Sequence, residues 1–187
     1  MNEKPIIAIL PGSRKQEITK MLSVMLSVVE DFPEYQFVIA GAPSQEFDFY
    51  EKFITNKNIQ FVANKTYDLL RIASAALVTS GTATLETALF KVPEVVCYKG
   101  SWASYQIAKR IITLKYISLV NLIMDEEVVT ELIQEECNPK RIREELKKIL
   151  EPNYRKVLLE KYDVLEEKLG GIGASEKTAK LIVADLK

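Results

Sequence analysis

The chain has 187 residues, 48% of them hydrophobic, which is enough to bury the core of a single domain. Its 25 lysine and arginine residues against 26 aspartate and glutamate residues give a formal net charge of −1, which excludes bulk electrostatic attraction to nucleic acid. The sequence contains no histidine, which excludes a Ser-His-Asp triad, an imidazole base and histidine metal ligands together.

Two cysteines, Cys97 and Cys137, lie far apart in the sequence and form no CxxC pair. This spacing argues against a disulfide framework and against a zinc site, and it fits a reducing cytoplasm. The apolar run within residues 1–10 is only about five residues long, shorter than the core of a signal peptide or a spanning helix. We therefore expect a soluble or peripheral cytoplasmic protein.

Short apolar runs alternate with helical patterns from the start of the chain to Asp125. The runs predict β-strands at residues 6–10, 36–40, 59–62, 76–79, 95–98 and, together with its loop, 116–123. Between the strands, apolar residues at helical spacing predict helices at residues 13–29, 45–54, 67–73, 83–90 and 102–114. Past Asp125 the pattern predicts helices alone, at residues 128–134, 139–150, 154–169 and 176–186.

Strands that alternate with helices at this spacing predict an α/β fold with a doubly wound, mostly parallel, Rossmann-like sheet of about six strands. We expect residues 1–150 to form this domain and residues 151–187 to form a helical C-terminal tail. Ligands of such sheets bind at the carboxyl ends of the strands. A site is therefore expected at the turns that follow the first and the fourth strand.

The first of these turns carries a glycine and then the start of a helix. Gly12 lets the backbone approach a ligand closely, and Ser13 and Gln16 have the spacing of a capping box. Arg14 and Lys15 oppose the helix dipole, which makes sense if an anion binds beside them. An ordinary capped helix with two solvated cations is the alternative interpretation.

The second turn places hydroxyls and a glycine between a buried strand and a helix N-terminus, an arrangement that can cradle a diphosphate. Ser80 and Thr82 can donate hydroxyl hydrogen bonds, and Gly81 leaves space for phosphate oxygens. Glu86 lies one turn deeper, where its carboxylate can accept two ribose hydroxyls. The alternative is a polar turn with a glutamate that stabilises the helix dipole.

Four ordered motifs carry a resemblance to a known family. They are Leu10–Arg14, Ser80–Glu86, Pro93–Tyr98, and Ile117–Leu122 followed by Val128–Leu132. In this order and spacing the chain resembles lipid-A-disaccharide synthase over essentially its whole length. The resemblance implies a GT-B architecture, in which two Rossmann-like domains face a cleft, and this chain is similar to the second of them.

The resemblance also implies a reaction and a site. UDP-2,3-diacylglucosamine is joined to 2,3-diacylglucosamine 1-phosphate, with inversion, to form lipid A disaccharide phosphate and UDP. Matching positions give the donor nucleotide-binding residues Gly12, Ser13, Arg14, Ser80, Gly81, Thr82, Glu86 and Asn121. The family's N-terminal half is expected to supply the catalytic base, so this half is expected to be inactive alone. No cofactor is expected. Because no DxD-like pair lies near the phosphate turns, we expect UDP to bind without a metal.

Several features leave alternatives open. The residues from Trp102 to Tyr116 suit a helix at the inner-membrane surface, or a domain-packing helix with snorkelling cations. The tail at residues 151–187 can pack on this domain, on the N-terminal half, or on a second copy in a homodimer. Two other functions compete: another UDP-N-acetylglucosamine enzyme, such as the peptidoglycan glucosaminyltransferase or a 2-epimerase, and a non-catalytic scaffold with this fold.

Overall fold

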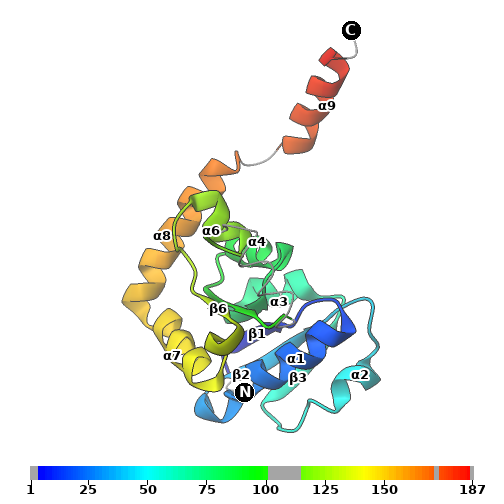
Figure 1. Ribbon diagram of the computed structural model, residues 1–187, viewed down its shortest axis with the longest axis vertical. Helices are drawn as coiled ribbons and strands as arrows, with labels where there is room; N and C mark the ends of the chain where they lie inside the picture. The colour runs from blue at the N-terminus through cyan, green and yellow to red at the C-terminus, as the bar shows by residue number, and fades with distance from the viewer. Residues whose placement is uncertain (1–3, 101–114, 171–172, 186–187) are drawn as a thin grey trace.

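The computed structural model describes residues 4–100, 115–170 and 173–185. They form one parallel β-sheet with helices on both faces (Figure 1). The strands are β1 (Ile6–Leu10), β2 (Gln36–Gly41), β3 (Ile59–Ala63), β4 (Ala73–Thr79), β5 (Glu94–Tyr98) and β6 (Glu131–Ile133). Their order is β3-β2-β1-β4-β5-β6, and every neighbouring pair is parallel. The predicted doubly wound sheet of six strands is confirmed.

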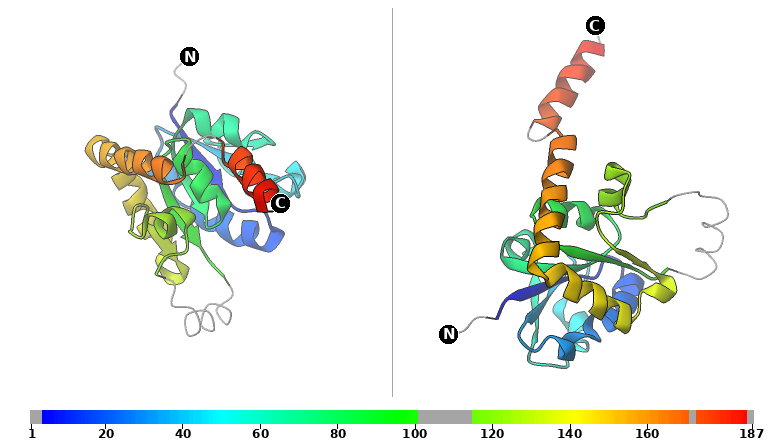
Figure 2. Two further views of the ribbon diagram at one scale, coloured as in Figure 1. Left: turned by 90° about the horizontal axis from the view of Figure 1, so that it is seen from above. Right: turned by 90° about the vertical axis from the view of Figure 1, so that its left-hand side faces the viewer.

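The helices connect and flank these strands. They are α1 (Lys15–Leu26), α2 (Phe47–Glu51), α3 (Thr66–Ile72), α4 (Thr82–Leu89), α6 (Leu119–Met124), α7 (Pro139–Leu150), α8 (Pro152–Lys168) and α9 (Ala174–Asp185), with 3-10 turns η1 (Val29–Asp31) and η2 (Gln134–Glu136). In the right-hand view of Figure 2, α1 and α7 lie on one side of the sheet, with α3 and α4 on the other. The expected helix at residues 102–114 lies outside the described residues.

The central strands are apolar on both faces because both faces are covered. In β1, Ile7 and Ile9 pack into the cluster that contains the buried side of α1, while Ala8 and Leu10 pack against α3. All four residues are at most 5% exposed. Burial of both faces produces the nearly continuous apolar runs that identified the strands in the sequence.

The prediction for the sixth strand is wrong. Residues 116–123 were expected to hold this strand and its loop, but Leu119–Met124 form the helix α6 instead. The helix begins after Ser118, whose Oγ accepts a hydrogen bond from the Asn121 N–H. The sixth strand is instead β6, within residues 128–134, where a helix was expected. A three-residue edge strand is too short to show a period of two, and its conformation is fixed by pairing with β5.

The C-terminal helices divide into a packed part and a projecting part. The side chains of Leu158, Tyr162 and Leu165 in α8 are buried, and Arg155 donates a hydrogen bond to the Ser74 carbonyl at the amino end of β4. Beyond α8, α9 extends away from the sheet (Figures 1 and 2). It exposes apolar side chains, with Leu181 72% exposed. Within the described ranges, we find no helix long and apolar enough to cross a membrane.

Candidate functional site

The turns after β1 and β4 leave the same edge of the sheet side by side. The two strands are hydrogen-bonded parallel neighbours, and Leu10 pairs with Val78 near their carboxyl ends. From here the chain winds in opposite directions, since β2 lies on one side of β1 and β5 on the other side of β4. This is the topological switch point, where doubly wound sheets bind their ligands.

A cavity of about 380 Å³ opens between the two turns. Its walls come from the β1 turn, the β4 turn with the start of α4, the end of β2 and the start of α3. The lining residues are Leu10, Pro11, Gly12, Ser13, Glu17, Ala40, Gly41, Ala42, Pro43, Thr66, Thr79, Ser80, Gly81, Thr82, Ala83 and Glu86. Six of the eight residues expected at the site therefore lie around one space, and the other two, Arg14 and Asn121, lie elsewhere.

Gly12 is required by the shape of the first turn. Its φ of +96° is a conformation that residues with a Cβ rarely adopt, and a Cβ there would lie 2.2 Å from Oε2 of Glu17. That same carboxylate oxygen accepts the Ser13 N–H at 3.2 Å. The expected capping box of Ser13 and Gln16 is wrong, because α1 begins after Arg14 and Glu17 holds the turn instead. Sequence reasoning missed Glu17 because its contact depends on the path of the turn.

Arg14 is exposed and stands beside the cavity rather than in its wall. The next residue, Lys15, places its ammonium 5.6 Å from the centre of the Phe49 ring. Within the described lining, the charged groups are the carboxylates of Glu17 and Glu86. An anion in this cavity would therefore depend on helix N-termini and hydroxyls, with Arg14, which follows the lining residue Ser13, as a cation beside the cavity.

The second turn presents an uncapped helix N-terminus to the cavity. Gly81 is the N-cap of α4, and within the described chain no side chain caps the helix. The Thr84 hydroxyl donates to the Gly81 carbonyl at 2.8 Å, which fixes the turn. Thr82 and Ala83 line the cavity, and their N–H groups lie in the first helical turn, where a helix has no acceptor of its own for them. The described atoms leave open space where a Cβ on Gly81 would stand. Backbone donors in this geometry bind anions.

Two hydroxyls of this turn have different surroundings. The Ser80 Oγ, expected to face a phosphate, donates to the carbonyl of Ile117 at 2.9 Å. Thr79 is 3% exposed, and its Oγ1 finds no hydrogen-bond partner in the part of the chain that the structure describes. A buried hydroxyl in a cavity wall is costly unless it is satisfied, so Thr79 favours a polar occupant.

Glu86 faces the same cavity from α4, one turn beyond the helix start. It is partly buried, and its carboxylate forms no hydrogen bond or ion pair with another described residue. The acceptor oxygens are therefore available to hydroxyl groups of a ligand.

The end of β2 forms a third wall that sequence reasoning did not assign to the site. The buried Tyr50 accepts the Ala42 N–H on its hydroxyl at 2.9 Å, and burial raises the pKa of Tyr50. Ser44 Oγ donates to the Ser13 carbonyl at 2.8 Å and ties this wall to the β1 turn. The sequence holds a signal for this wall, because Gly41 and Pro43 end a strand that a doubly wound order places next to β1.

Asn121 lies outside the cavity lining, and its side chain is fully buried. Its amide oxygen accepts the N–H groups of Val128 and Val129, and its amide nitrogen donates to the Val129 carbonyl and to Glu131. All four hydrogen bonds of the amide are used inside the protein. Asn121 therefore holds the backbone of Val128 and Val129 in place, and its amide has no hydrogen bond left for a ligand.

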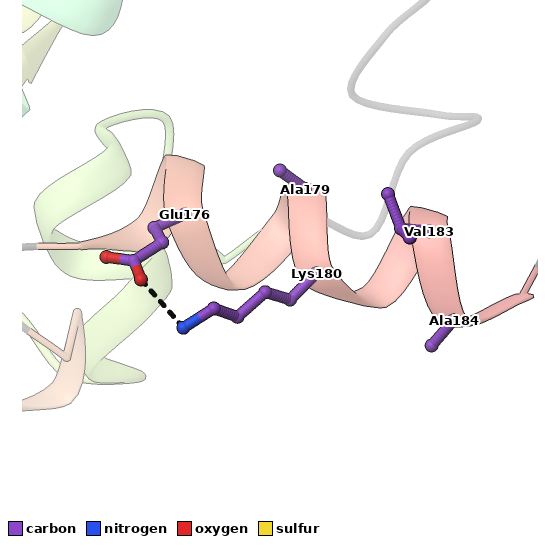
Figure 3. Close-up of a pocket in the computed structure, with 5 residues that line it drawn as sticks. All are labelled: Glu176, Ala179, Lys180, Val183 and Ala184. Atoms are coloured by element: carbon purple, nitrogen blue, oxygen red, sulfur yellow. Dashed lines mark ion pairs between the residues drawn. The ribbon is translucent and has the colours of Figure 1, made fainter.

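A second hollow lies on α9 and carries no argument for a site. All five of its lining residues come from that one helix, and the polar pair among them, Glu176 and Lys180, is joined by an ion pair of 2.7 Å (Figure 3). The hollow is one side of an exposed helix. The described residues also contain no cluster of three or more cysteine, aspartate or glutamate side chains that could hold a metal ion.

Comparison with protein families gives one match that spans nearly the whole chain. The sequence profile of the lipid-A-disaccharide synthetase family matches residues 1–182. The lipid-A-disaccharide synthase of Syntrophus aciditrophicus (strain SB) is 39% identical over 189 residues, which cover 97% of this chain and 49% of that protein. The chain therefore spans about half the length of the curated relatives it matches.

Solved structures with the same fold include glycosyltransferases and UDP-N-acetylglucosamine 2-epimerases. The glycosyltransferase SnogD from Streptomyces nogalater has a TM-score of 0.58 at 17% identity, over 97% of this chain and 44% of that one. The C-terminal CMP-Kdo binding domain of WaaA from Acinetobacter baumannii has a TM-score of 0.54 at 11% identity, over 87% and 89% of the two chains. At these identities the likeness shows the fold, which is the Rossmann-like fold of GT-B glycosyltransferases.

Proposed function

This chain belongs to the lipid-A-disaccharide synthetase family, and from that membership and the cavity at the switch point we propose that it binds the UDP part of a diacylglucosamine donor. The observation that carries the proposal is the convergence of two strand-to-helix turns on one cavity with an uncapped helix N-terminus in its wall. Such an arrangement suits a pyrophosphate group.

Each wall has a role in this proposal. The N–H groups at Gly81, Thr82 and Ala83 bind the diphosphate, with Gly12 and Ser13 approaching from the opposite turn. Glu86 accepts hydrogen bonds from the ribose hydroxyls, because its carboxylate is unoccupied among the described residues. Arg14 reaches the phosphates from the rim when the nucleotide is bound.

The reaction proposed for the whole protein joins UDP-2,3-diacylglucosamine to 2,3-diacylglucosamine 1-phosphate and releases UDP. An inverting transfer needs a base for the acceptor hydroxyl and stabilisation for the departing diphosphate. This chain supplies the stabilisation of the departing diphosphate, through the α4 N-terminus and Arg14. We assign the base, and the acceptor site, to the part of the relatives that this chain does not span.

Two alternatives are less well supported. Another UDP-N-acetylglucosamine enzyme of the same architecture would share the fold, but the family match favours the lipid A enzyme. Among the described residues, the Thr79 hydroxyl has no partner and the Glu86 carboxylate is available in the same cavity, which a scaffold without ligand would not need. Nucleotide binding separates a scaffold from a donor domain.

We also propose a division of the chain at the break between α7 and α8. Residues 1–150 hold the donor cavity, and residues 151–187 form the helical tail, of which α8 packs on the domain. The exposed apolar side chains of α9 favour a covering surface, either in the rest of the enzyme or in a second subunit. Attachment to the inner-membrane surface belongs to this proposal too, because the substrates are acylated.

Isothermal calorimetry with UDP tests the proposal. The wild-type chain should bind UDP, and Glu86→Ala and Arg14→Ala should each weaken binding by roughly 1–3 kcal/mol, through loss of ribose or phosphate contacts. Arg71→Ala is the matched control, since Arg71 is an exposed cation at the far end of α3 that pairs with Asp68. A wild-type chain that takes up no UDP would refute the proposal.

A further inference from the structure

We propose that Glu131 is a positioning residue that holds the phosphate-binding turn in shape through the backbone at residues 117–118. The proposal rests on the donor site described above and adds a residue of β6 to it. Glu131 lies on the edge strand, two strands away from β4, and it is not among the residues that line the cavity. Its effect on a nucleotide must therefore pass through other residues.

The Glu131 carboxylate accepts four hydrogen bonds from residues 117–121. Its Oε2 accepts the Ile117 N–H at 2.9 Å. Its Oε1 accepts the Ser118 N–H at 2.8 Å, the Ser118 hydroxyl at 2.7 Å and the Asn121 amide at 2.9 Å. One side chain therefore fixes both peptide N–H groups that precede α6, and it fixes the capping serine of that helix as well.

Residues 117–118, which Glu131 fixes, are joined directly to the turn that follows β4. The Ile117 carbonyl accepts the Ser80 hydroxyl at 2.9 Å, so Ile117 is bonded to Glu131 on its N–H and to Ser80 on its C=O. The Ser80 N–H makes only a long hydrogen bond, 3.3 Å, to the Cys97 carbonyl. The hydroxyl bond is thus the shorter of the two that hold Ser80, and it sets the direction of the following Gly81 and Thr82 N–H groups.

Asn121 makes this arrangement rigid. Its buried amide binds the backbone of Val128 and Val129, just before β6, and donates its remaining proton to Glu131. The carboxylate is therefore held from its own strand and from α6 at once. A fully satisfied network of this kind has one geometry, which is what a preorganised phosphate turn requires.

Glu131→Gln tests the proposal, because glutamine keeps the size of the side chain but cannot accept on both terminal atoms. Glu145→Gln is the matched control. Glu145 is a 7% exposed carboxylate on α7 that accepts the hydroxyl of Thr130, the residue before Glu131, at 3.0 Å. Its other partners are the cations Arg141 and Lys148 on its own helix, so it has no bond to residues 117–118 among the described contacts. The variants are compared by amide NMR without ligand and by UDP calorimetry.

We expect Glu131→Gln to move the Ser80 and Gly81 amide signals and to weaken UDP binding by about fivefold to tenfold, whereas Glu145→Gln leaves both unchanged. In a Ser80→Ala background, Glu131→Gln should cause no further loss of UDP affinity, because Ser80→Ala already removes the hydrogen bond to the Ile117 carbonyl through which Glu131 acts. Additive losses, or lower stability with unchanged UDP affinity, would overturn the positioning role and leave the donor site intact.

Should Glu131→Gln fail to fold, hydrogen exchange of the wild-type chain decides the question. UDP should slow exchange of the Ile117 and Ser118 amides, although neither residue lines the cavity, because coupling between two positions is reciprocal. Unchanged exchange at these amides with UDP bound would contradict the proposal. A wild-type chain that does not bind UDP would overturn the proposed function and this inference with it.

Discussion

Replacing Gly12 by alanine tests how the first turn is built. Gly12 has a φ of +96°, and an added Cβ would overlap the Glu17 carboxylate. The left-handed conformation costs alanine about 1–2 kcal/mol. The overlap is relieved when Glu17 rotates away, which breaks its hydrogen bond with Ser13 and costs about 0.5–1.5 kcal/mol more. Together these contributions predict a loss of about 1.5–3.5 kcal/mol in unfolding free energy.

A second glycine separates the two contributions. Gly170 has a φ of +78°, and in the described structure a Cβ there would meet open space. Gly170→Ala should therefore cost only the backbone part, so the two variants should differ by about 1 kcal/mol, or about 2–4 °C in Tm for a chain of this size. Chemical denaturation and calorimetric melting measure both. Glu17→Ala should cost little more in the Gly12→Ala background, since the bond it removes is already lost. Equal losses for Gly12→Ala and Gly170→Ala would refute the reasoning.

Three further predictions concern charge. Glu17→Gln keeps an acceptor for the Ser13 N–H and removes a negative charge from the cavity wall, so UDP affinity in calorimetry should rise about twofold to tenfold; an unchanged affinity would place the diphosphate elsewhere. Chelation of divalent metal with EDTA should leave UDP affinity unchanged, and a strict magnesium requirement would contradict the metal-independent site. Burial raises the pKa of Glu94 in the folded protein well above its ordinary value. In the unfolded chain a glutamate has a pKa of about 4.3. The stability that its bound proton provides is therefore complete below that pH and is lost as the pH rises through the raised pKa. In urea denaturation, the unfolding free energy of Glu94→Gln should increase relative to that of the wild type as the pH rises from 4.5 to 7.5. A difference between the two proteins that does not change with pH would contradict this prediction.

The sequence predicted those parts of the fold that depend on long, regular patterns. The strands β1 and β4 are buried on both faces, so their apolar runs were visible, and each is followed by a glycine turn and a helix. The rule that doubly wound sheets bind ligands at the carboxyl ends of their strands then brought Gly12 and Gly81 to one cavity.

The parts that could not be predicted depend on contacts between distant residues. β6 has three residues and forms a strand because β5 lies beside it, which no local pattern reveals. Glu17 and Tyr50 contribute to the site through single hydrogen bonds to backbone groups of the turns. Asn121 was singled out from a motif, but the motif could not show that its amide is turned toward Val128 and Val129 instead of the cavity.

Titration of the chain with UDP, followed by backbone amide NMR, tests the central claim most directly. If both turns hold one diphosphate, the amide signals of Ser13, Gly81 and Thr82 will move together and fit a single Kd. Signals that move at only one turn, or at neither, would contradict a shared pocket between β1 and β4.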